Sequence, residues 1–156
     1  MKSKTFFAVV LLYLVSIVVL GQDAIALRKK HFNLDDNIAI SGYDPVSYFK
    51  INKAVKGKKE VAVNYQGVIY YFSSVENKEE FKKNPSQYEP GYGGWCAYAM
   101  GANGEKISID PATFKIINGK LYLFYNRFFN NTLKSWNKDE VKLKTAAEAN
   151  WKFFFH

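Results

Sequence analysis

Two hairpin patterns constrain the fold of this chain most. Val61–Phe72 is dominated by β-branched and aromatic residues on either side of Gln66-Gly67. Thr113–Tyr125 repeats the pattern around Asn118-Gly119. An Asn-Gly pair between such arms is a strong hairpin signal, because a type I′ turn needs positive φ at both central positions. The sequence therefore predicts two antiparallel hairpins that join in one small sheet.

A short helix is predicted directly after the first hairpin. Ser73 and Glu76 fit a capping box, in which a hydroxyl caps the helix and a carboxylate follows three residues later. Good helix formers continue over Val75–Lys83. Asn84 precedes Pro85, and a residue before proline is disfavoured in helical conformation, so the helix ends there.

The C-terminal region is predicted to form two helices. Asn126 can cap the first, which runs to about Asn137, and the second extends from about Lys138 to Trp151. The predicted fold class is α+β: a small antiparallel sheet from two hairpins, a short helix after the first, and two C-terminal helices.

The N-terminus has the pattern of a secretory signal peptide. Lys2 and Lys4 precede an uninterrupted apolar run over residues 6–20, and Gly21 follows as a small residue. We expect residues 1–21 to be removed after Gly21, with Ala26 as an alternative cut. A retained anchor is the competing interpretation, although the run is shorter than the roughly 20 residues that span a bilayer.

These observations predict an exported protein, periplasmic or secreted, with one folded domain. After the signal segment, residues 22–34 are polar and basic and are interpreted as a linker. Residues 35–156 are interpreted as a single domain, since a chain of this length usually forms one.

The formal charge of +8 raises the question of a nucleic-acid partner. The lysines are scattered along the chain, and only Arg28 and Arg127 supply the guanidinium that reads bases bidentately. We therefore expect no nucleic-acid partner. Weak contact with an anionic membrane surface remains open.

The only cysteine lies in an aromatic and glycine-rich stretch over residues 92–100. Cys96 follows a Gly-Gly pair and stands between Trp95 and Tyr98. A lone cysteine forms no disulfide within the chain, so its thiol is either buried and inert or reactive. The chemistry of the protein is expected to centre on this residue.

Several separated blocks resemble the YHS domain family. Residues 70–88 show its aromatic strand and short helix, with Phe81, Pro85 and Tyr88 at the family spacing. Further blocks resemble the exported branch of the family; they are residues 42–49, 93–99, 117–123 and 149–151. The resemblance extends over roughly residues 35–151.

This sequence departs from the metal-binding members of the wider family at three positions. Those members place cysteines where this chain has Ser47, Ser73 and Asn77. A structural zinc site needs four Cys or His ligands, and the chain adds only His31 and His156 to its one cysteine. We expect no zinc site of the family type.

Four interpretations of Cys96 remain. With Met100 four residues on, a helical turn would bring two sulfurs to one face and suit copper as Cu(I). An exposed thiol could be a redox sensor, and a buried one could simply fill space. The fourth is a small-ligand pocket, whose expected residues are Tyr43, Asp44, Tyr92, Trp95, Cys96 and Tyr98.

The resulting functional hypothesis is a non-enzymatic binding module with its site around Cys96, for a small ligand or a soft metal such as copper. The alternative is a thiol redox or sensor protein. An enzyme is disfavoured, because a nucleophilic cysteine needs a neighbouring base and both histidines lie near the chain ends.

Overall fold

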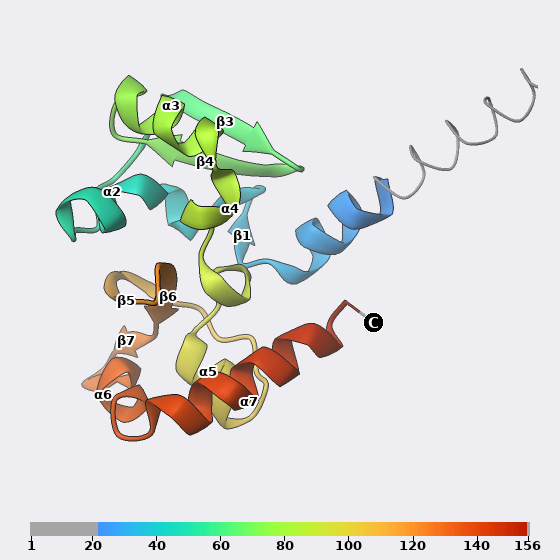
Figure 1. Cartoon of the computed structure of the whole chain (residues 1–156), viewed down its shortest axis with the longest axis vertical. Helices are drawn as coiled ribbons and strands as arrows, with labels where there is room; N and C mark the ends of the chain where they lie inside the picture. The colour runs from blue at the N-terminus through green and yellow to red at the C-terminus, as the bar shows by residue number, and fades with distance from the viewer. Residues whose placement is uncertain (1–21, 156) are drawn as a thin grey trace, which may run out of the picture.

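The computed structural model describes residues 22–155, arranged in two halves that lie one above the other in Figure 1. The predicted signal peptide, residues 1–21, lies outside the described residues. The first half holds β1 to β4 and α2 to α4, and the second half holds α5 to α7 and β5 to β8. The chain is a mixed α+β structure, as predicted.

A four-stranded sheet organises the first half. Its strands are β1 (Leu34–Asp35), β2 (Ile38–Ala39), β3 (Lys58–Tyr65) and β4 (Val68–Phe72), in the order β1-β2-β4-β3. The first predicted hairpin is confirmed as β3 and β4, which are antiparallel. β2 adds to β4 in parallel, so the sheet is mixed rather than purely antiparallel.

The short helix predicted after this hairpin is α3 (Val75–Lys83). The predicted cap is displaced by one residue: Ser74, not Ser73, accepts the backbone N–H of Asn77. Ser73 instead donates its hydroxyl to the carboxylate of Asp44. Next to α3 lie α2 (Pro45–Ile51) and α4 (Pro85–Tyr88), whereas the 3-10 turn η1 (Ile40–Gly42) lies against β4.

The second hairpin forms a sheet of its own, so the prediction of one sheet from both hairpins is wrong. β5 (Asp110–Ile117) and β6 (Lys120–Phe124) form a two-stranded sheet, and Leu123 of β6 also makes an isolated parallel bridge with Cys96. The side chains of β6 alternate between two hydrophobic clusters: Leu121 and Leu123 belong to one, Tyr122 and Phe124 to the other. This hairpin therefore lies between two cores instead of extending the first sheet.

Both C-terminal helices are present, and the first is shorter than predicted. A third small hairpin, β7 (Asn126–Arg127) and β8 (Asn130–Asn131), occupies the start of the predicted segment. The helix α6 (Thr132–Trp136) then begins under an Asn131 cap, whose side chain accepts the N–H of Leu133. The last helix is α7 (Glu140–Phe153).

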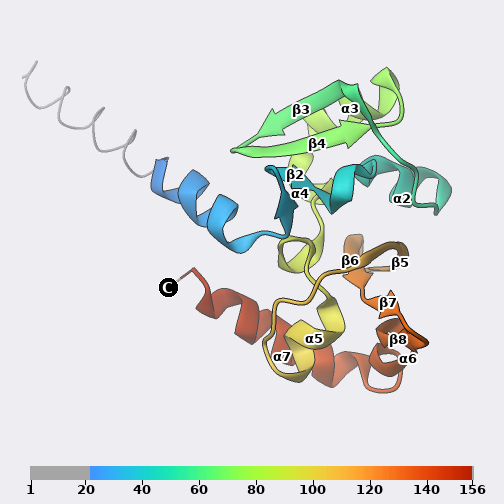
Figure 2. The ribbon, with the colours of Figure 1, turned by 180° about the vertical axis from the view of Figure 1, so that it is seen from behind.

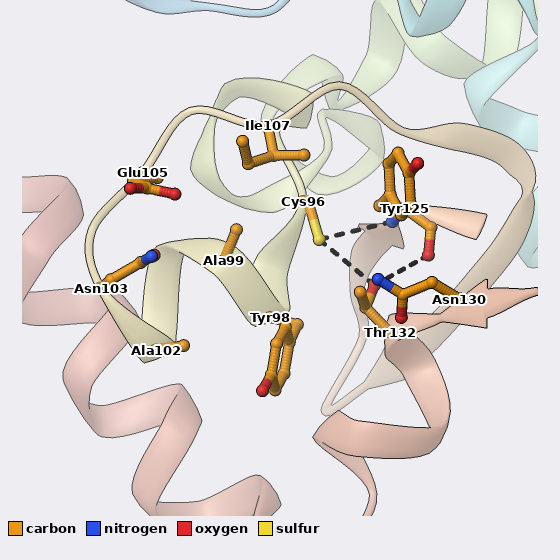
Figure 3. A pocket seen from close by; sticks show the side chains of 10 residues that line it. All are labelled: Cys96, Tyr98, Ala99, Ala102, Asn103, Glu105, Ile107, Tyr125, Asn130 and Thr132. Carbon is orange, nitrogen blue, oxygen red and sulfur yellow. Dashed lines mark hydrogen bonds between the residues drawn. The ribbon is translucent and has the colours of Figure 1, made fainter. Parts of the chain in front are cut away.

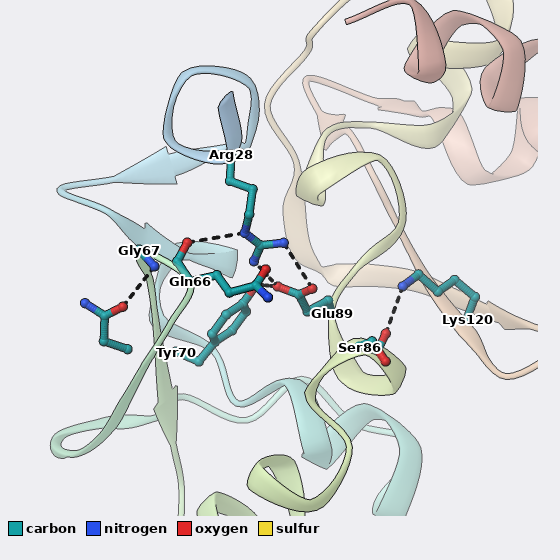
Figure 4. Close-up of polar contacts among 8 residues, drawn as sticks. Arg28, Gln66, Gly67, Tyr70, Ser86, Glu89 and Lys120 are labelled. Atoms are coloured by element: carbon teal, nitrogen blue, oxygen red, sulfur yellow. Dashed lines mark hydrogen bonds and ion pairs between the residues drawn. The ribbon is translucent and has the colours of Figure 1, made fainter. Parts of the chain in front are cut away.

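The segment interpreted as a linker is helical over residues 22–31, and it contacts the rest of the fold (Figure 2). Arg28 forms an ion pair with the carboxylate of Glu89, which also accepts the hydroxyl of Tyr70 at 2.5 Å (Figure 4). Burial lowers the pKa of Arg28, but the hydrogen bond and charge of Glu89 outweigh it, so the pKa is raised. None of the described helices is long and apolar enough to cross a membrane.

Two buried tyrosines predict that the fold loses stability in alkali. Tyr48 donates to the carbonyl of Pro111 at 2.9 Å, and Tyr70 donates to Glu89. Burial, reinforced by neighbouring carboxylates, raises the pKa of both hydroxyls above the usual 10.0. The folded chain then retains protons that the unfolded chain releases. Their stabilisation is complete below about pH 10 and falls by about 1.4 kcal/mol per pH unit for each tyrosine above it.

Far-UV circular dichroism and tyrosinate absorbance, followed together as the pH rises, measure this effect. We expect loss of secondary structure to accompany ionisation of the buried tyrosines. Tyr48→Phe should reduce the steepness with which the free energy of unfolding falls above pH 10. Full ionisation of every tyrosine in a chain that keeps its native spectrum would contradict the prediction.

Candidate functional site

A pocket of about 400 Å³ lies in the second half of the molecule, with Cys96 in its wall (Figure 3). It is formed by α5 (Ala97–Ala102), the loop that follows α5, the end of β6 and the hairpin β7–β8. The other residues that line it are Tyr98, Ala99, Ala102, Asn103, Glu105, Ile107, Tyr125, Asn130 and Thr132.

The glycine-rich stretch before Cys96 delivers the cysteine to this pocket. Over η2 (Gly91–Gly94) three consecutive residues have positive φ: Tyr92 (53°), Gly93 (59°) and Gly94 (86°). Gly93 has little room for a side chain, because a Cβ there would lie 2.8 Å from the rings of Phe32 and Trp151. The backbone N–H of Cys96 then donates to the carbonyl of Ile107 at 2.9 Å.

The thiol of Cys96 is fully buried and lies in a closed ring of hydrogen bonds. The backbone N–H of Tyr125 donates to the sulfur at 3.4 Å, and the sulfur lies 3.4 Å from the hydroxyl of Thr132 (Figure 3). The hydroxyl of Thr132 donates its own hydrogen bond to the carbonyl oxygen of Tyr125 at 2.9 Å. The S–H therefore donates to Thr132, and the arrangement accommodates a protonated thiol.

Of the six residues expected around a small-ligand pocket, the structure brings Cys96 and Tyr98 together. Trp95 lies elsewhere and donates its indole N–H to the carbonyl of His31 at 2.7 Å. Tyr92 packs its ring against Tyr122, with 5.4 Å between centroids.

Tyr43 and Asp44, the other two expected residues, lie in the first half. Tyr43 pairs with Lys56 in an isolated β-bridge, and the ammonium of that lysine lies 4.8 Å from the tyrosine ring centroid. Asp44 caps α2. Neither residue lines the pocket beside Cys96.

Met100 and Cys96 face different parts of the core. The helical spacing argument required both residues to be on α5, but Cys96 is its N-cap, with ψ of 115°, and lies outside the helical turn. Cys96 belongs to the cluster around β4, whereas Met100 packs in the cluster around Trp136. The structure does not bring the two sulfurs to one helix face.

Eight of the residues that line the pocket were not among the site residues expected from the sequence: Ala99, Ala102, Asn103, Glu105, Ile107, Tyr125, Asn130 and Thr132. They come from α5, the loop after α5, the residue after β6, β8 and the start of α6, so no single sequence segment contains them. Their proximity to Cys96 depends on long-range contacts that the sequence does not indicate, such as the bridge between Cys96 and Leu123.

Ser47, Ser73 and Asn77, which occupy the family's cysteine positions, do converge in space. They surround Asp44, which is fully buried. One carboxylate oxygen of Asp44 accepts the N–H of Ser73 at 2.9 Å, its hydroxyl at 2.6 Å and the amide of Asn77 at 2.7 Å. The other oxygen accepts the N–H of Val46 at 2.9 Å. We call Asp44, Ser47, Ser73 and Asn77 the Asp44 cluster.

The Asp44 cluster is completed by Ser47, whose hydroxyl lies 2.8 Å from the carbonyl oxygens of Asp44 and Lys53. The polar side chains of the cluster are thus held together by hydrogen bonds. Among the described residues, no three His, Cys, Asp or Glu side chains are grouped closely enough to hold a metal ion.

His31 lies near the C-terminal aromatic residues rather than near Cys96. Its ring centroid is 5.4 Å from that of Phe154, and its Nδ1 lies 2.8 Å from the ammonium of Lys106. Burial and the charges of Lys106 and Lys30 lower the pKa of the imidazole. This histidine does not contact the cysteine thiol.

The family model of the YHS domain matches residues 44–92. The match begins at Asp44, includes the whole Asp44 cluster and ends before Cys96, so the pocket lies beyond it. Comparison with curated proteins and with solved structures gives no match. The chain therefore carries a YHS domain over residues 44–92.

Proposed function

We propose that the protein is an exported, non-enzymatic binding module that holds a small ligand in the pocket beside Cys96. The observation that carries this proposal is the pocket itself, a concavity of about 400 Å³ with two aromatic walls, Tyr98 and Tyr125. Ligand sites are typically such clefts, mainly apolar and with a few placed polar groups.

The polar groups suggest the class of ligand. Glu105 is exposed at the pocket and offers a carboxylate, while Asn103 and Asn130 offer amides. Ile107 and the small side chains of α5 supply apolar surface. A small, mainly apolar molecule with an amine or hydroxyl donor fits this combination.

The surroundings of the sulfur favour binding over thiol chemistry. The partners of the Cys96 sulfur are a backbone N–H and a threonine hydroxyl, and neither can act as a general base. The ring of hydrogen bonds also fixes the relative positions of α5, β6 and α6. In this proposal Cys96 shapes the pocket wall and does not react.

Native mass spectrometry of the protein purified from its own compartment tests the pocket. We expect a bound small molecule on the native chain and its loss from Ala99→Phe, because Ala99 lines the pocket and a phenyl ring would fill it. Ala149→Phe is the matched control, since Ala149 is exposed on α7, outside the pocket. Equal occupancy of both variants, or no bound molecule on the native chain, would refute the pocket as a ligand site.

The reactivity of Cys96 separates this proposal from a thiol redox or sensor function. The side chain has 0% exposure, so a thiol reagent reaches it only when the structure opens. We expect native Cys96 to react with N-ethylmaleimide at least about a hundredfold more slowly than in the unfolded chain. Reaction at the unfolded rate under native conditions would favour the redox function instead.

A further inference from the structure

Four two-residue hairpin turns join paired strands in the described part of the chain, and one differs from the others in its residues. In all four, both central residues have positive φ, which is the type I′ conformation. Three use residues that tolerate this conformation: Asp36-Asn37, Gln66-Gly67 and Asn118-Gly119. The fourth, between β7 and β8, consists of Phe128-Phe129, with φ of 50° and 64°. Bulky aromatic residues rarely adopt positive φ.

Both phenylalanines of this turn extend into solvent. Phe128 is 89% exposed and Phe129 is 112% exposed. A phenylalanine normally buries on the order of 150–250 Å² of surface in a core or an interface. The turn therefore combines an unfavourable backbone conformation with two large apolar side chains that the fold does not cover, and such a combination is typical of a functional contact.

The charge around the turn identifies the surface that fits it. No acidic residue occurs between Asp110 and Asp139, a stretch that contains five basic residues: Lys115, Lys120, Arg127, Lys134 and Lys138. Arg127 precedes the turn and Lys134 follows it on α6, and both side chains are exposed. Apolar side chains flanked by cations complement an anionic lipid interface, which attracts the cations and solvates the rings.

We propose that the β7–β8 turn is a membrane-docking wedge, in which Phe128 and Phe129 insert into the interface of an anionic bilayer while Arg127 and Lys134 contact its headgroups. β7 and α6 lie at the side of the molecule away from helix 22–31 in both Figure 1 and Figure 2. A protein partner or a second copy of the chain would be a different occupant, and the experiment distinguishes them.

A fluorescent label at the turn reports the contact locally in the full chain. Phe129→Cys places a thiol at the tip of the turn and keeps Phe128, and a maleimide dye labels it selectively because Cys96 is buried. With vesicles of equimolar phosphatidylcholine and phosphatidylglycerol, we expect a blue shift and an intensity increase of an environment-sensitive dye. The same dye on Val75→Cys, an exposed position in α3, should not respond.

The decisive variant replaces the aromatic pair by the favoured turn residues, Phe128→Asn with Phe129→Gly. Asn-Gly suits a type I′ turn, so the melting temperature should be equal or higher, while vesicle affinity falls about tenfold or more. Arg127→Gln with Lys134→Gln keeps the rings and should abolish the salt dependence of binding. Undiminished vesicle binding by the Asn-Gly variant would overturn the proposal. So would a dye response that appears only as the protein concentration rises without vesicles, since it would identify a second copy as the occupant.

Discussion

Replacing Asp44 by alanine is expected to lower the free energy of unfolding by about 4 kcal/mol. The carboxylate accepts four hydrogen bonds in a fully buried setting. The donors are the N–H groups of Val46 and Ser73, the Ser73 hydroxyl and the Asn77 amide. Each buried donor left without an acceptor costs about 1–3 kcal/mol, and their sum exceeds the gain from no longer burying a carboxylate.

Urea unfolding at neutral pH measures this effect, and Asp110→Ala provides the matched control. Asp110 also precedes a proline and accepts two hydrogen bonds, from Ala112 and Thr113, but it is only half-buried. We expect Asp110→Ala to cost about 1 kcal/mol. Equal losses for the two variants would show that Asp44 acts only as an ordinary turn aspartate.

Asp44→Asn tests the contribution of the negative charge, because it keeps the shape of the side chain and removes its charge. In asparagine, an NH₂ group replaces one of the two carboxylate oxygens of Asp44, and that NH₂ group would face neighbours that donate hydrogen bonds in the native structure. If the amide nitrogen faces Ser73 and Asn77, the hydrogen bonds from the Ser73 N–H and the Asn77 amide are lost, while the Ser73 hydroxyl can reverse and accept; if it faces Val46, one is lost. We expect the asparagine to choose the second orientation and to destabilise the protein less than alanine does.

The Asp44 cluster explains how the segment matched by the YHS model keeps its shape with serine and asparagine where the resemblance implies cysteines in metal-binding members. Asp44 connects the start of α2, the residue after β4 and the first turn of α3. Here neutral donors converge on one carboxylate, so the connection needs no cation.

The sequence predicted the elements whose signals are local. Gln66-Gly67 and Asn118-Gly119 located two hairpins, because few residues accept a type I′ turn. Pro85 located the end of α3, because its ring disfavours helical conformation in the residue before it. The sequence analysis missed the β7–β8 hairpin, because its turn residues, Phe128-Phe129, are not residues that typically form a type I′ turn.

The candidate site was only partly predictable, because its geometry depends on backbone path and long-range contacts. The spacing of Cys96 and Met100 suggests one helix face only if both are helical, and Cys96 is instead the N-cap of α5. Tyr43 and Asp44 were grouped with Cys96 on residue type alone. The pairing of β6 with β5, rather than with the first sheet, brings Tyr125 to the thiol and places those two residues in the other half.

Gly101→Ala is expected to destabilise the protein by about 3 kcal/mol, although alanine is the better helix former. In an isolated helix the change would gain about 1 kcal/mol. In this fold α5 packs against α7, and a Cβ on Gly101 would overlap the carbonyl oxygen of Leu143 and lie 3.0 Å from its carbonyl carbon. Backbone atoms cannot rotate away as a side chain can, so the two helices must separate, and contacts between them are lost.

Thermal and urea unfolding of Gly101→Ala, compared with Gly119→Ala, separate steric overlap from backbone strain. Gly119 has φ of 74° and no atom within 4 Å of a built Cβ, so alanine there adds only strain, about 1 kcal/mol. A larger loss at Gly101 than at Gly119 places the cost in the contact between α5 and α7. Because α5 also forms one wall of the Cys96 pocket, Gly101→Ala should weaken ligand retention as well, whereas Gly119→Ala should leave it unchanged. Stabilisation by Gly101→Ala would mean that helix propensity outweighs the contact, and that α7 does not hold α5 in place.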